Sequence, residues 1–168
     1  NGSDSGHVRV YEYSSGSWTQ VGSDIDGEAA NDSSGYSVSI DSDGSHVAIG
    51  AEGNDGTGSN AGHVRVYSWD GSAWTQSGND IDGEAASDRL GYSVSIKDDG
   101  THVAIGAPFN DGNGDNAGHV RVYDIEALIA STVTTSEATI AGSLTVDSVV
   151  IDGTTIGHSS DSDLMTLA

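Results

Sequence analysis

The chain has no cysteine, a single proline and only five basic residues among 168. Without cysteine, disulfides cannot stabilise the fold, and thiol chemistry is excluded. No run of about 18 apolar residues occurs, so no segment is predicted to cross a membrane as a helix. The five basic residues stand against 26 acidic ones, which gives a net charge of −21. Such a surface repels phosphate backbones and anionic lipids, so nucleic acid and membranes are disfavoured as partners.

What the sequence does contain is an internal repeat. The hexapeptide Gly-His-Val-Arg-Val-Tyr begins at Gly6, Gly62 and Gly118, at two intervals of 56 residues. Residues 6–61 and 62–117, aligned without gaps, are identical at 38 of 56 positions. Two complete repeats are therefore present, and a third stops after its first six residues. Repetition at this period is typical of architectures built from stacked units.

Each repeat holds four short apolar-alternating segments between turn signals. Val64 and Val66 share one face of the first segment, and Asp99-Gly100 gives the strongest hairpin signal. No window has a helical period. We therefore expect an all-β fold with four antiparallel strands per repeat, which suits a β-propeller blade. In the second repeat these segments are residues 63–67, 74–76, 91–96 and 102–107.

A family resemblance rests on four of these segments. They are Leu90-Gly-Tyr-Ser-Val-Ser-Ile, Asp99-Gly100, Val103-Ala-Ile-Gly-Ala-Pro108 and Gly118-His-Val-Arg-Val-Tyr. Together they resemble the FG-GAP repeat, whose members include the propeller of integrin α subunits. The Ser-x-Trp-Thr-Gln segment is similar to the bacterial and phage version of the repeat. The resemblance covers residues 6–123 and implies β-propeller-type blades.

In that family a blade begins at its inner strand, here residues 35–41 or 91–97. On this phasing the chain holds half a blade, one full blade at about 35–77, and most of another at 91–124. Two and a half blades cannot close a ring of about four to eight. Either further blades lie upstream, or several chains pool their blades in one ring. The first is favoured because Asn1 falls inside a loop that matches the loop before Gly62.

The C-terminal part has a different composition. We expect propeller-type repeats over residues 1–123, a linker at 124–131 and an elongated β-rich shaft at 132–168. Residues 151–167 resemble segments of tail-fibre and structural proteins of marine cyanophages. That resemblance implies a virion component that forms a homotrimer through residues 132–168. A threonine-rich connector in a secreted repeat protein is the alternative interpretation.

Calcium is the one cofactor for which the sequence offers candidate ligands. Integrin-type members hold Ca²⁺ in an Asp-rich loop, because this ion prefers six to eight hard oxygen ligands. The corresponding segments here, Asp41–Gly44 and Lys97–Gly100, are shortened and match a hairpin turn better than a ligand set. Asp111, Asn113 and Asp115 place oxygens at alternate positions, as in half of a calcium loop. We therefore take these three residues as the candidate calcium ligands. The alternative is that they form a solvated Gly/Asn/Asp loop without an ion.

Other acidic and histidine residues recur with the repeat. The acidic group Asp24–Glu28 returns at Asp80–Glu84. Its repetition is consistent with cation bridging between blades, but a structural loop between blades is favoured. A residue present in every blade is expected to hold each blade together, because a catalytic residue is needed only once. Structural packing is therefore also expected of the histidines, which occupy two repeat positions: His7, His63 and His119 in one, His46 and His102 in the other.

Two tryptophans are the remaining candidates for recognition. Trp18 and Trp74 occupy one repeat position on a predicted outer strand. Their rings could stack on sugars, and the alternative is that each ring caps its own blade. No nucleophile elbow flanks any serine, and nothing in the chain argues for catalysis.

Two functions are consistent with these observations. The first is a non-catalytic structural or adhesion component of a virion or other extracellular appendage, in contact with a host surface, a surface glycan or a receptor. The second is a secreted or cell-surface adhesion module of a marine bacterium that depends on calcium. Both place the protein in a virion or outside the cell. The first gives it copies of itself as partners, whereas calcium-dependent melting as a monomer would favour the second.

Overall fold

The computed structural model describes residues 2–125, and every regular element within them is a β-strand. No helix in this part of the chain is long and apolar enough to span a membrane. The described residues belong to one compact unit of the chain, which spans residues 1–133. The predicted shaft at 132–168, its role in a trimer and most of the predicted linker at 124–131 lie outside the described residues.

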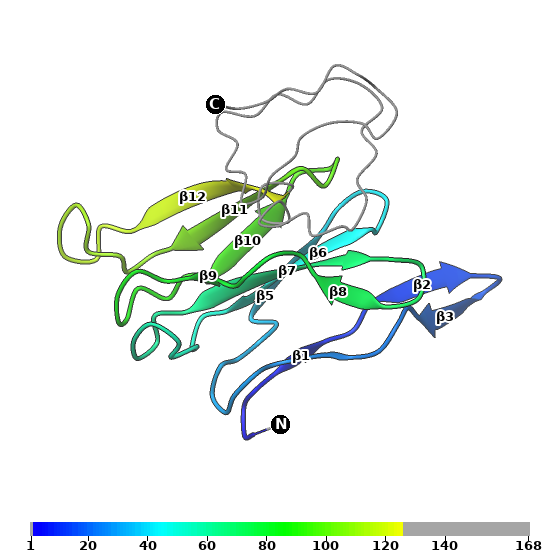
Figure 1. The fold of residues 1–168 in the computed structure, drawn as a ribbon, viewed down its shortest axis with the longest axis horizontal. Helices are drawn as coiled ribbons and strands as arrows, with labels where there is room; N and C mark the ends of the chain where they lie inside the picture. The colour runs from blue at the N-terminus through cyan, green and yellow to red at the C-terminus, as the bar shows by residue number, and fades with distance from the viewer. Residues whose placement is uncertain (1, 126–168) are drawn as a thin grey trace, which may run out of the picture. The chain divides into compact units, whose positions relative to one another are not determined.

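Within residues 2–125, twelve strands follow one another along the two repeats and the start of the third (Figure 1). The first repeat forms β1 (His7–Val8), β2 (Tyr11–Ser14), β3 (Ser17–Gln20), β4 (Ile25–Asp26), β5 (Ser37–Ile40) and β6 (His46–Ala51). The second forms β7 (His63–Trp69), β8 (Trp74–Gln76), β9 (Ile81–Asp82), β10 (Ser93–Ile96) and β11 (His102–Ala107). The third opens with β12 (His119–Asp124).

The strands form small antiparallel sheets that repeat the same pairing. One sheet has the order β5-β6-β7-β8, with β9 pairing to β7, and the next has the order β10-β11-β12. The register also repeats, since Ser37 pairs with Gly50 and Ser93 with Gly106. β2 pairs with β3, and β1 pairs with β4. The all-β prediction is confirmed, and the sheets of residues 2–125 remain open rather than closed on themselves.

The predicted hairpin at Asp99-Gly100 joins β10 to β11. Gly100 has a φ of 70°, a conformation that costs little for glycine and is unfavourable for most other residues. Its N–H donates to the carbonyl of Lys97 at 2.9 Å, which closes the turn. Asp43-Gly44 forms the corresponding turn between β5 and β6, where Gly44 has a φ of 77°.

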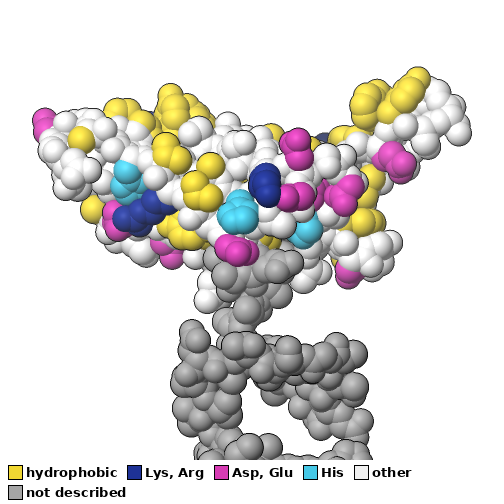
Figure 2. Space-filling model, turned by 90° about the horizontal axis from the view of Figure 1, so that it is seen from above, with side chains coloured by type: hydrophobic (Ala, Val, Ile, Leu, Met, Phe, Trp, Pro, Cys, Tyr) yellow, Lys and Arg dark blue, Asp and Glu magenta, His cyan; other side chains and the backbone are white. Residues whose placement is uncertain are grey.

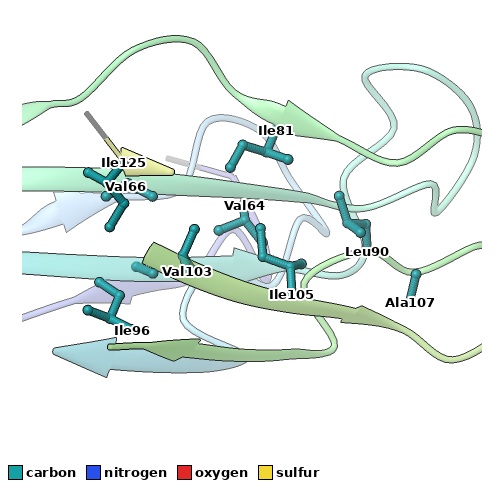
Figure 3. Close-up of a cluster of buried hydrophobic side chains, with 10 residues drawn as sticks. Val64, Val66, Ile81, Leu90, Ile96, Val103, Ile105, Ala107 and Ile125 are labelled. Carbon is teal, nitrogen blue, oxygen red and sulfur yellow. The ribbon is translucent and has the colours of Figure 1, made fainter. Parts of the chain in front are cut away.

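The main hydrophobic core lies between two successive sheets (Figure 3). Val64 and Val66 on β7 face Val103 and Ile105 on β11, and all four side chains are buried. The opposite face of the first sheet has a second apolar cluster: Ile25, Val47, Ile49 and Tyr67. The β5–β8 sheet is therefore covered on both faces, and β7 is buried over residues 63–67. β12 has the same sequence at its start but alternates between half-buried and exposed residues.

Candidate functional site at the junction between repeats

The inner strands of the two sheets are joined by side chains of β5. Ser37 Oγ donates to the carbonyl of Gly91 at 2.6 Å. Ser39 Oγ accepts the backbone N–H of Ile96 at 2.9 Å. Gly50 allows this approach, because a Cβ at that position would lie 2.1 Å from the Gly91 oxygen. Small residues on β5 and β6 thus bring successive repeats into backbone contact.

The outer strands are joined through tryptophan. Trp74 Nε1 donates to the carbonyl of Val21 in the first repeat at 2.9 Å, and its ring lies 5.3 Å from that of Trp69. Trp18, at the same repeat position, is 69% exposed and contacts the Tyr13 ring at 5.1 Å. The two predicted sugar-stacking residues therefore have different surroundings. Trp74 is partly covered by a neighbouring repeat, and Trp18 presents an open ring.

Three ionisable side chains from both repeats meet at the same junction. His63, the first residue of β7, is 1% exposed. Its Nδ1 lies 3.6 Å from Asp80 Oδ2 and 3.9 Å from Glu28 Oε2. Among residues 2–125, this is the group of three histidine or carboxylate side chains whose ligand atoms all lie within 4.8 Å of one another. It is the described arrangement best suited to hold a metal ion.

Neighbouring donors hold the second oxygen of each carboxylate. Gln76 Nε2 donates to Asp80 Oδ1 at 2.7 Å. The Arg65 guanidinium lies 3.4 Å from Glu28 Oε1 and is anchored by a 2.9 Å hydrogen bond to the carbonyl of Asp26. One oxygen of each carboxylate thus has an amide or guanidinium partner, and the other lies toward His63. Figure 2 shows a face on which acidic, basic and histidine side chains lie beside one another.

The protonation of His63 follows from its surroundings. Burial lowers the pKa of its imidazole because the charged form loses solvation, whereas the charges of Asp80 and Glu28 raise it and that of Arg65 lowers it further. The net effect is a lowered pKa, so the ring is neutral at neutral pH. Its buried Nδ1 has no hydrogen-bond partner within the described part of the chain.

The equivalent residues of the other repeats are paired differently. Arg9 donates to both oxygens of Asp24, at 2.9 and 2.7 Å. This pairing, with help from Gln20, lowers the pKa of Asp24 to about 2. Glu84 accepts a hydrogen bond from Arg121, which lowers the pKa of its carboxyl. The complete group of one histidine and two carboxylates therefore forms once among residues 2–125.

The predicted calcium ligands lie in an exposed loop before β12. Asp111 Oδ1 accepts the backbone N–H of Asn116 at 2.7 Å, and Asp115 Oδ1 accepts the Asn116 side-chain amide at 3.0 Å. Asn113 is exposed between them. One oxygen of each carboxylate is thus used within the loop. Calcium binding by this loop stays a prediction.

The two shortened loops at the integrin-type calcium position are occupied by protein contacts. Asp41 is buried, and its oxygens accept hydrogen bonds from the backbone and side chains of Ser45 and His46. The Lys97 ammonium lies 2.5 Å from Asp99 Oδ2. Carboxylate oxygens at both positions are thus engaged by the hairpin or by a cation, which agrees with the expectation of a hairpin turn rather than a ligand set.

A comparison with protein families gives a match over part of the chain. Residues 81–123 match the FG-GAP repeat. The match extends from β9 to β12, and the 56-residue spacing makes residues 25–67 its internal counterpart. The predicted presence of an FG-GAP-type repeat is confirmed. A search of curated proteins found no match.

Sequence reasoning found the parts of the ionisable cluster but not the cluster itself. It singled out the acidic groups at Asp24–Glu28 and Asp80–Glu84, and separately the repeated histidine. It did not bring them together, because Glu28 is 35 residues before His63 and Asp80 is 17 residues after it. The recurrence of both features at one period was the available signal.

Proposed function

We propose that this chain is a non-catalytic structural and adhesion component of a virion or other extracellular appendage, built from propeller-type blades. It acts by joining to further units of its own kind and by presenting an acidic surface. The FG-GAP repeat match and the four-strand order β5-β6-β7-β8 support blades of this type. The net charge of −21 supports a medium rich in salt and cations.

The polar residues that recur in the repeats support a structural role. Asn54 Nδ2 donates to Asp32 Oδ2 at 3.2 Å, and the equivalent Asn110 Nδ2 donates to Asp88 Oδ2 at 2.7 Å. All four residues are buried. The same polar pair therefore has the same role in each repeat, fastening the loop after β4 or β9 to the loop after β6 or β11.

One observation supports association more than any other: the apolar surface that is buried at the junction between the repeats recurs within residues 2–125 at positions where no described residue covers it. Ile96 is 7% exposed at the junction, whereas Ile40, its equivalent one repeat earlier, is 46% exposed. Val66 is 2% exposed, whereas Val122, its equivalent one repeat later, is 65% exposed. We call these two surfaces the leading face, which includes Ile40, and the trailing face, which includes Val122.

The two faces are complementary by construction. At the internal junction, the surface equivalent to the leading face packs directly on the surface equivalent to the trailing face. Exposed apolar sheet faces of this kind favour association. A leading face therefore fits a trailing face, whether that trailing face belongs to a further blade of the same chain or to another copy in a head-to-tail contact.

A mixing experiment with two variants tests this proposal. Ile40→Asp places a charge on the leading face and Val122→Asp places one on the trailing face, each on the full chain. We expect the unmodified chain to associate in sedimentation velocity, each variant alone to be impaired, and their mixture to form a one-to-one pair. The mixture recovers because each variant keeps the face that the other has lost. Thr75→Asp, on the exposed outer strand β8, serves as the control.

The stoichiometry also separates the alternatives. A trimer that both charged variants retain would place association in residues 132–168 and contradict the face-to-face contact. Monomers at every concentration would contradict association altogether. A melting temperature that rises with calcium in the unmodified chain, but not in Asp115→Asn, would instead support the calcium-dependent adhesion module. Its candidate ligands lie in the exposed loop before β12.

A further inference from the structure

We propose that Glu28, His63 and Asp80 form a binding site for a divalent transition metal, such as Zn²⁺, that fastens the first repeat to the second. The chemistry required is one imidazole nitrogen and two carboxylate oxygens, with a fourth position left to water. The three ligand atoms all lie within 4.8 Å of one another at the junction.

The distances suit a small tetrahedral ion. Zn²⁺ binds nitrogen and oxygen at about 2.0–2.2 Å, which separates tetrahedral ligand atoms by about 3.3–3.6 Å. The Nδ1 of His63 lies 3.6 Å from Asp80 Oδ2 and 3.9 Å from Glu28 Oε2. Glu28 is exposed and Asp80 is partly exposed. Rotation of these two side chains brings their oxygens into range without moving the buried ring.

The surroundings are those of a supported metal site. Residues beyond the direct ligands commonly orient the ligands through hydrogen bonds. Here Gln76 holds the Oδ1 atom of Asp80, and Arg65 lies beside the Oε1 atom of Glu28. The remaining oxygen of each carboxylate is directed toward a buried nitrogen that lacks a hydrogen-bond partner within residues 2–125.

The nature of the ligands also sets the selectivity. Imidazole suits Zn²⁺, Ni²⁺ and Cu²⁺, whereas Ca²⁺ and Mg²⁺ prefer sets of oxygen ligands. A neutral imidazole is the form that binds metal, and the burial of His63 favours that form. Calcium is therefore not expected to displace zinc here, which separates this site from the candidate calcium loop at Asp111–Asp115.

The position of the ligands gives the ion a structural effect. Glu28 follows β4 in the first repeat, whereas His63 and Asp80 belong to β7 and the turn before β9. An ion held by all three joins the loop of one repeat to the sheet of the next. Because the site exists only in the folded chain, binding stabilises that fold.

The test uses the untagged full chain titrated with Zn²⁺ by calorimetry and with Co²⁺ by visible absorption. We expect one site per chain, a tetrahedral cobalt spectrum and a zinc-dependent rise in melting temperature. Asp80→Asn and Glu28→Gln lie at the surface, keep the shape of the side chains, and should each weaken zinc binding by more than about tenfold. His63→Gln should abolish the cobalt spectrum.

The matched controls are His7→Gln and His119→Gln, which change the same repeat position outside the cluster. Both should bind zinc as the unmodified chain does. Two outcomes would overturn the proposal by assigning zinc to the general acidic surface. In the first, the Asp80 and Glu28 variants bind zinc as tightly as the unmodified chain. In the second, the two control variants lose as much zinc affinity as the Asp80 and Glu28 variants do. Absence of any zinc-dependent change in the unmodified chain would overturn it as well. Excess Ca²⁺ should leave the cobalt spectrum unchanged.

Discussion

Replacing the same isoleucine with alanine in successive repeats should have very different effects on stability. Ile96 and Ile40 occupy one position of the inner strand, on β10 and β5. Ile96 is 7% exposed because it packs on the preceding sheet, and Ile40 is 46% exposed because no described residue covers it in the same way. The two variants therefore compare burial with sequence and strand held constant.

The expected magnitudes follow from the area and the cavity. Ile→Ala removes three carbons, worth about 0.8 kcal/mol each when fully buried. At Ile96 this gives about 2.4 kcal/mol, and the cavity left between two sheets raises the loss of unfolding free energy to about 3 kcal/mol. At Ile40 about half of the transfer term remains and no closed cavity forms, so the loss is about 1 kcal/mol. The difference is about 2 kcal/mol.

Urea unfolding followed by tryptophan fluorescence and circular dichroism measures both variants. The experiment is run on dilute protein, where the leading face is free. Equal losses at the two positions would refute the reasoning, because they would show that the inter-sheet core does not depend on the neighbouring repeat. A loss at Ile40 that grows with protein concentration would show instead that association covers this residue.

Three further predictions use the same internal comparisons. Gly50→Ala should destabilise the chain more than Gly106→Ala in urea unfolding, because the added methyl group meets backbone of the next repeat at 2.1 Å only at the first position. Trp74→Phe should lower the unfolding free energy by about 1 kcal/mol through its lost hydrogen bond, whereas Trp18→Phe should change it little. The lowered pKa of His63 means that the unfolded state takes up a proton first as pH falls below about 6.5. Stability should therefore decline below that pH, and the decline should be shallower in His63→Gln; equal pH profiles would contradict this.

The strands were predictable from the sequence because each has a strong local signal. Alternation of valine with polar residues marked β7, and Asp99-Gly100 marked the turn between β10 and β11. The two-residue strands β4 and β9 instead fall in segments that the sequence predicts as loops. Their pairing with β1 and β7 depends on chain segments that lie far away in sequence. No local pattern of two residues can specify such a partner.

The candidate site likewise combines features that the sequence indicates with features that only the packing of distant segments decides. Repetition directed attention to the histidine and acidic positions, and it favoured a structural role for both. It could not show that His63 is buried while His7 is exposed, since the two residues have the same sequence neighbours. Only the cover supplied by adjoining strands distinguishes them. The same reason separates Trp74 from Trp18.

The sequence by itself determined the period, the all-β character of the repeats and the acidity of the chain, because these depend on local pattern and composition. Tertiary structure decided which copy of each repeated residue is buried, paired or open. The identical pentapeptides His-Val-Arg-Val-Tyr that open β7 and β12 differ in burial because, among the described residues, β7 has packed side chains on both of its faces and β12 on one face only. The ionisable cluster at the junction arises for that reason, from packing between repeats rather than from any one repeat.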